Sequence, residues 1–106
     1  MDKKTRQALA MKAEIFKAMG HPTRLFMLEV LSEGPRCVCE LQEMIGADMS
    51  TISKHLTIMR NVGLVDSEKQ GTKVIYRSTI GCLRSFSKCL ETVIQKRRDA
   101  LAVELN

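Results

Sequence analysis

Aromatic residues are scarce in this sequence. It has no tryptophan, one tyrosine and three phenylalanines among 106 residues. The core must therefore be built from leucine, isoleucine, valine, methionine and alanine, which favour helices and close aliphatic packing. A chain of this length is the size of one ordinary domain, so we expect residues 1–106 to form a single one.

Long apolar runs are absent as well. No stretch approaches the roughly 20 apolar residues that a membrane-spanning helix needs, so no membrane partner is expected. The N-terminal residues lack the apolar block and cleavage site of a signal peptide, and we expect a cytoplasmic protein. The four cysteines would then lie in a reducing compartment, where paired thiols more often bind metals or react than form structural disulfides.

Charge is unbalanced, but only moderately. Seventeen basic and twelve acidic residues give a net charge of +5, and the pI is near 9.2. With 44% hydrophobic and 27% charged residues, the composition is that of a globular chain rather than a disordered one. A surface of this charge suits a phosphate backbone or another anionic partner.

Apolar spacing predicts four helices, then a hairpin, then a last helix. The first three helices are expected over residues 3–19, 23–32 and about 38–45, the third burying Leu41, Met44 and Ile45. The fourth runs from a cap at Asp48 or Ser50 to about Asn61. The last covers about residues 80–105.

A change of period after Gly63 predicts the hairpin, over about residues 64–78. Two segments rich in branched and aromatic residues flank the compact turn Lys69-Gln70-Gly71-Thr72. The fold class is therefore mainly α with a small β-hairpin, in the winged helix-turn-helix arrangement. The helix-turn-helix occupies about residues 38–61, with its turn at Gly46-Ala47-Asp48.

The second helix of such a motif enters the major groove, so double-stranded operator DNA is the expected partner, with no cofactor needed for binding. The inward face of this helix should be Ile52, Leu56 and Met59, and its outward face includes Ile58. Short hydroxyl, amide and basic side chains on this helix and on the hairpin are the candidate DNA contacts: Ser50, Thr51, Ser53, Lys54, Thr57, Lys69, Gln70, Thr72, Lys73 and Arg77.

The last helix is too long to be covered by so small a domain. Its apolar seam includes Leu83, Phe86, Leu90 and Leu101. Together with the first helix it offers a two-fold surface, and we expect a homodimer formed through the first and last helices.

The segment Arg36-Cys37-Val38-Cys39-Glu40 stands at the start of the third helix. A helix N-terminus and a neighbouring arginine favour thiolate, and thiolate ligands select soft ions. On a regular helix the two side chains would point about 200° apart. They can share one ion only if the first turn unwinds or if the cysteines precede the regular helix.

Several motifs together resemble the ArsR/SmtB family of metal-responsive repressors. These are Ala18 to Leu25 (AMGHPTRL), Ser50 to Leu56 (STISKHL), Met59 to Val65 (MRNVGLV) and Gly71 to Arg77 (GTKVIYR). The resemblance covers roughly residues 8–95 and implies a dimeric repressor that leaves its operator when an inducer binds. Met49 departs from the polar residue that many relatives carry at the start of this helix.

Cys37-Val38-Cys39-Glu40-Leu41 further resembles the arsenite- and antimonite-responsive branch of that family. This implies As(III) or Sb(III) as inducer and Cys37 and Cys39 as its ligands. Some members have a third cysteine where this chain has Gln42, so the third ligand could come from Cys82, Cys89 or an exogenous thiol or water. The last helix has no histidine, and no zinc site is expected.

Two alternatives to this prediction remain open. The same DNA-binding module could respond to oxidation or persulfidation of its thiols. A small dithiol enzyme is the more distant alternative, because no βαβ pattern surrounds the cysteine pair and no acid–base partner lies near it in the sequence. We therefore expect a regulator and not an enzyme.

Overall fold

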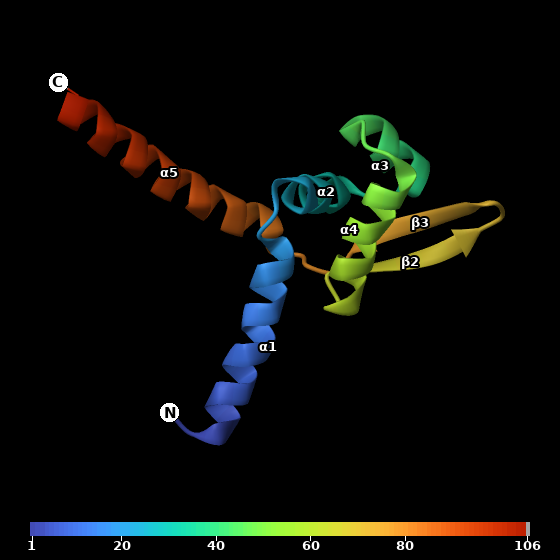
Figure 1. The fold of residues 1–106 in the computed structure, drawn as a ribbon, viewed down its shortest axis with the longest axis horizontal. Coiled ribbons are helices and arrows are strands. Elements are labelled where there is room, and N and C mark those ends of the chain that lie inside the picture. Colours follow the sequence, from blue (N-terminus) through green and yellow to red (C-terminus); the bar gives the residue numbers. More distant parts are fainter. Residues whose placement is uncertain (106) are drawn as a thin grey trace.

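The computed structural model describes residues 1–105. The elements follow one another as α1 (Lys3–Met19), α2 (Pro22–Glu33), β1 (Arg36–Cys37), α3 (Val38–Ile45), α4 (Met49–Asn61), β2 (Val65–Gln70), β3 (Lys73–Ser78) and α5 (Leu83–Leu105) (Figure 1). The expected order of helices and hairpin is confirmed. The strand β1 was not predicted.

Strand β1 converts the predicted hairpin into a three-stranded antiparallel sheet of order β1-β3-β2. Arg36 pairs with Tyr76 and Cys37 with Ile75, so the segment before α3 is hydrogen-bonded to the wing, which is the hairpin of β2 and β3. The pattern of the sequence could not show this strand, because two residues after a proline are too few for an alternation of apolar and polar side chains.

Local capping fixes where α2 and α4 begin. His21 is the N-cap of α2, and its Nδ1 accepts a hydrogen bond from the backbone N–H of Thr23 at 3.1 Å. Asp48, one of the two caps considered for α4, holds that position and accepts from the Thr51 N–H at 2.7 Å. This backbone hydrogen bond is the main reason that the pKa of Asp48 is lowered.

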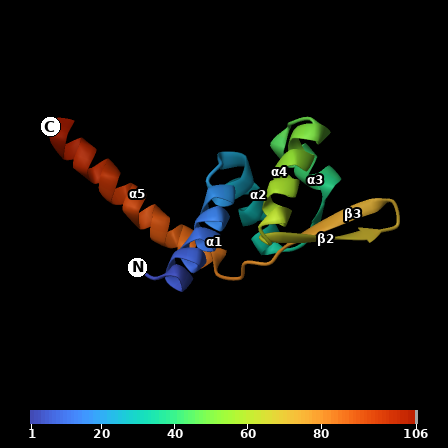
Figure 2. The same ribbon diagram turned by 60° about the horizontal axis from the view of Figure 1, so that its bottom comes forward.

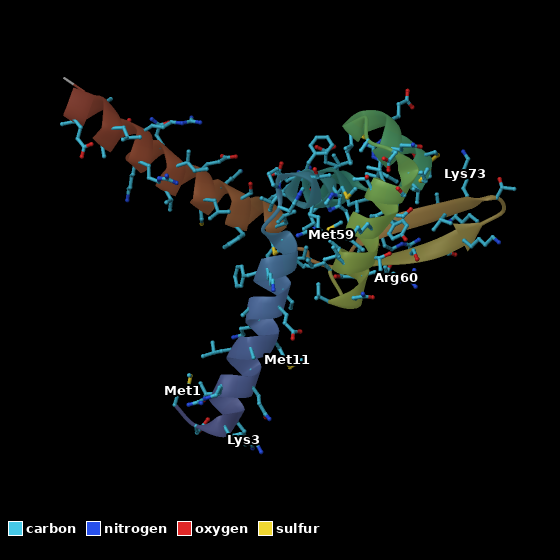
Figure 3. The ribbon with its side chains drawn as sticks, viewed as in Figure 1. Met1, Lys3, Met11, Met59, Arg60 and Lys73 are labelled. Carbon is cyan, nitrogen blue, oxygen red and sulfur yellow. A yellow bond between two sulfur atoms is a disulfide. The ribbon has the colours of Figure 1, made fainter. Side chains whose placement is uncertain are left out.

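The inward face of α4 is buried as predicted. Ile52, Leu56 and Met59 are each at most 1% exposed, and they pack with α2 and α3 in one apolar cluster; Figure 3 shows Met59 between α4 and α2. The prediction for Met44 was wrong, since its side chain is 48% exposed. Helix α3 has only eight residues, and Leu41 takes its fully buried position.

The N-terminal half of α1 and most of α5 project away from α2–α4 and the wing, and the molecule measures 57 × 43 × 23 Å (Figures 1 and 2). Near their meeting point the rings of Phe16 and Phe86 lie 6.0 Å apart. Farther out, Leu9 on α1 and Leu90 and Leu101 on α5 are 41–56% exposed. Within residues 1–105, none of the helices combines the length and the apolar character that crossing a membrane requires.

A histidine pair connects the start of α2 to the middle of α4. The rings of His21 and His55 are 4.6 Å apart. A guanidinium nitrogen of Arg24 lies 3.1 Å from Nδ1 of His55, while Arg24 Nε donates to the carbonyl of Ala18. Burial lowers the pKa of His55, and the positive charges of His21, Arg24 and Lys54 act in the same direction.

Leu56→Ala is expected to lower the free energy of unfolding by about 2–5 kcal/mol, because it leaves a cavity in the core. Thr57→Ala removes a neighbouring exposed side chain and should change it by no more than about 0.5 kcal/mol. Urea denaturation followed by circular dichroism measures both. Equal losses would mean that the inward face of α4 is assigned incorrectly.

His55→Gln is expected to flatten the loss of stability on mild acidification. Because the pKa of His55 is lower in the folded protein, the unfolded chain takes up the proton first. The stability gained by keeping His55 neutral in the folded protein is therefore complete above the unfolded pKa of about 6.5 and is lost as pH falls through that value. Urea denaturation at pH 7.5 and 5.5 tests this, and an identical pH dependence in the variant would contradict it.

Candidate functional site

The outward face of α4 carries the side chains expected to meet DNA. Ser50, Thr51, Ser53, Lys54 and Thr57 are all exposed. The placement of Ile58 on this face was wrong, because its side chain is partly buried and packs against the core. It lines a cavity whose other walls include Glu14 and Ala18 of α1, so this helix covers part of the predicted outward face.

The tip of the wing presents a second set of predicted contacts. Lys69, Gln70, Thr72 and Lys73 are exposed, and Figure 3 shows Lys73 projecting from the wing. Arg77 differs from them. It is partly buried and pairs with Glu68 at 2.8 Å and with Asp66 at 3.6 Å, both on the neighbouring strand β2. Its guanidinium is thus engaged within the wing itself.

The structure brings the two cysteines of the Cys-Val-Cys segment together as a disulfide. Their Cα atoms are 5.3 Å apart, within the range that such a bond requires. Cys37 has an extended backbone, φ −76° and ψ 158°, because it ends β1 and caps α3 rather than lying within the helix. The sequence allowed the sulfurs to meet either through an unwound first turn or through cysteines that precede the regular helix. The structure has the second arrangement, because Cys37 lies before the first turn of α3.

The Cys37 sulfur is part of a reciprocal cap. Its Sγ accepts a hydrogen bond from the backbone N–H of Glu40 at 3.3 Å, and the Glu40 carboxylate accepts from the Cys37 N–H at 3.2 Å. The latter bond, with the hydrogen bond from Arg36, lowers the pKa of Glu40.

The two cysteines differ in exposure. Cys37 is 3% exposed, whereas Cys39 is exposed. Both line a cavity of about 450 Å³, together with Met49 and Ser53 of α4 and Val74 of β3. The segment Cys37–Cys39, helix α4 (the expected recognition helix) and the wing therefore line one cavity. The sequence did not indicate this arrangement, because it depends on β1 pairing with β3.

Cys82 and Cys89 are not brought to this pair. They are exposed and line a different, apolar cavity of about 380 Å³, with Met19 of α1 and Phe86 of α5. Within residues 1–105, no three side chains of histidine, cysteine, aspartate or glutamate are grouped closely enough to hold a metal ion. The protein groups of one protomer thus offer two sulfurs at this site.

Comparison with known proteins places residues 21–67 in the family "Bacterial regulatory protein, arsR family". An uncharacterized HTH-type transcriptional regulator of Methanocaldococcus jannaschii is 46% identical over 60% of this chain and 73% of its own length. A biofilm growth-associated repressor of Xylella fastidiosa is 32% identical over 76% and 71%, respectively. A homologue of the cadmium resistance regulator CadC from Staphylococcus aureus is 38% identical, but the match spans only 54% of it.

The fold is also shared with solved structures. The crystal structure of Mycobacterium tuberculosis Rv0081 superposes with a TM-score of 0.76, covers 90% of this chain and 96% of its own, and is 28% identical. Reduced HlyU from Vibrio cholerae gives a TM-score of 0.73 at 25% identity, over 87% and 97% of the two chains. Relatives and fold are those of transcriptional regulators rather than enzymes, and this chain belongs to the ArsR family of winged helix-turn-helix DNA-binding regulators.

Proposed function

We propose that this protein is a homodimeric repressor that leaves its operator when As(III) or Sb(III) binds Cys37 and Cys39. One observation carries the proposal: the cavity beside the two cysteines is walled by the recognition helix α4 and the wing strand β3. A ligand on these sulfurs would lie next to the surface that meets DNA.

The DNA-binding half of the proposal rests on the chemistry of α4. Its exposed side chains are short hydroxyls and a lysine, which can reach base edges or phosphates without holding the backbone away. The wing tip adds Lys69 and Lys73 for phosphate contacts. Arg77 is a weaker candidate, since contact with DNA would compete with its ion pairs to Glu68 and Asp66.

The dimer is supported by the two projecting helices. Much of α1 and α5 lies away from the helix-turn-helix and the wing, so a second subunit could cover their exposed apolar residues without blocking DNA (Figure 1). Phe16 of α1 is 57% exposed and Val93 of α5 is 55% exposed. A two-fold dimer presents two recognition helices to two half-sites of one operator.

The inducer is argued from the donor atoms. Two cysteine sulfurs, with no third histidine, cysteine, aspartate or glutamate side chain grouped with them among residues 1–105, favour a soft, thiophilic ion over zinc or nickel. Arsenic and antimony in their trivalent states meet that description. Cys37 ends strand β1, which pairs with β3 of the wing, and it also caps α3. A ligand held there therefore acts both on the wing and on the helix that precedes α4.

Oxidation is a second candidate signal, and the disulfide favours it. The sulfurs of Cys37 and Cys39 are already placed for reversible bonding, with one cysteine exposed to an oxidant. Conversion between dithiol and disulfide would act on the same strand and helix cap. The two candidates require opposite sulfur chemistry, because a trivalent metalloid binds only the reduced pair.

The first test is arsenite-dependent release of DNA. A fluorescent duplex selected by the reduced protein from random sequences is the probe, and anisotropy is followed under argon after removal of the reductant. Arsenite should dissociate the complex, and Cys37→Ser or Cys39→Ser should raise the required concentration at least tenfold. Cys82→Ser is the matched control and should behave as wild type. Dissociation by a disulfide oxidant but not by arsenite would establish the second candidate instead.

The second test concerns the phosphate contact of Lys54. Lys54→Ala should weaken DNA binding and reduce the slope of log K against log salt by roughly 0.9 for each subunit that loses a phosphate contact. Lys88→Ala makes the same charge change on α5 and should leave the slope nearly unaltered. An unchanged slope in Lys54→Ala would show that this lysine does not neutralise a phosphate.

A further inference from the structure

Helix α4 begins with an exposed apolar residue. Met49 is the first residue of this helix and is 41% exposed. It lies outside the apolar core cluster, to which α4 contributes Ile52, Leu56 and Met59. Core packing therefore does not account for a methionine at the start of the helix that is expected to enter the major groove.

The neighbours of Met49 are residues expected to meet DNA. It lines the cavity between α4 and the wing together with Ser53, Thr72 and Lys73, three exposed side chains among the predicted DNA contacts. Met44, by contrast, is exposed beside a separate cavity between α2 and α3. Of these two exposed methionines, Met49 is the one that lies within the predicted reading surface.

The polar side chains next to Met49 are engaged with one another. Asp48 accepts hydrogen bonds from the backbone N–H of Thr51 at 2.7 Å and from the hydroxyl of Ser50 at 2.9 Å. This cap fixes the first turn of α4 and directs the Ser50 proton to Asp48. The side chain of Met49 lies between these two residues in the sequence and takes no part in the cap. It stands at the N-terminal end of the helix, from which recognition helices contact base edges.

The chemistry of the major groove limits what Met49 could recognise there. Phosphate oxygens and the polar atoms of base edges need hydrogen-bond partners, and a thioether offers at most a weak acceptor. The base edges also carry one methyl group, at C5 of thymine. Contact between that methyl group and a methionine side chain removes apolar surface of both from water.

We propose that Met49 is a specificity-determining residue that contacts the 5-methyl group of one thymine in each operator half-site. The inference rests on the DNA-binding part of the proposed function and specifies one feature of the operator. Methionine is longer than the serines at positions 50 and 53, and its unbranched chain adapts to the shape of its partner. A cytosine at the same place lacks the methyl group and is bound less well.

The test removes this methyl group and nothing else. A fluorescent duplex is selected from random sequences by the reduced wild-type protein, and each thymine is replaced in turn by deoxyuridine, which pairs identically but has no 5-methyl group. Binding is measured by anisotropy. At one thymine position, replacement should weaken binding about fourfold in one half-site and about fifteenfold in both, because burial of one methyl group contributes about a factor of four.

Variants of the protein assign the effect to Met49. Met49→Gln keeps the length of the side chain and removes its apolar end, so it should bind the thymine and deoxyuridine duplexes within about twofold of each other. Met44→Gln is the same change at a site 48% exposed on α3, and it should keep the wild-type ratio. Circular dichroism checks the fold of both, and Met49→Ala replaces Met49→Gln if the latter is unfolded.

The outcomes separate this inference from the proposed function. If wild type tolerates every deoxyuridine, or if Met49→Gln retains each deoxyuridine effect in full, Met49 does not contact a thymine methyl group and the inference is wrong, although the repressor still binds DNA. A variant that weakens all duplexes by one common factor would show a structural role only, with the same consequence. If wild type selects no duplex at all, the DNA-binding part of the proposed function fails, and the inference fails with it.

Discussion

The placement of Cys37 is the constraint on which the rest of this site depends. One residue ends β1, begins α3 as its N-cap and bonds to Cys39. Its extended backbone turns the sulfur out of the helix path, where it can accept the N–H of Glu40. Had α3 begun one turn earlier, the two cysteine side chains would point to different sides of a helix and could not share a partner.

This constraint is transmitted through short connections. Strand β1 is hydrogen-bonded to β3, which pairs along its length with β2. Helix α3 is joined to α4 by three residues, and the two helices share the apolar cluster that includes Leu41 and Ile52, both fully buried. The histidine pair and Arg24 hold the other side of α4 against α2 and the end of α1. Helix α4 is therefore held on one side by α3 and on the other by α2 and the end of α1. The cysteines act only on the first of these two sides.

The sequence predicted those parts of the molecule that periodicity and capping specify. Ile52, Leu56 and Met59 are buried as expected, and Asp48 and His21 cap their helices, because these signals lie within one or two turns. Tertiary packing decided the positions that failed. Met44 is exposed near the C-terminal end of the eight-residue helix α3, and Ile58 is covered because α1 lies against α4. Neither β1 nor the cavity beside the cysteines follows from local pattern, since both require β3 to lie alongside residues 36–37.

The short distance between the sensing and reading residues has a thermodynamic consequence. If ligand and DNA exclude one another through Ser53 and Lys73, each must weaken the other by the same factor, because coupling between two binding equilibria is reciprocal. A repressor bound to its operator therefore needs a higher inducer concentration than the free protein does, by the same factor by which the inducer weakens DNA binding.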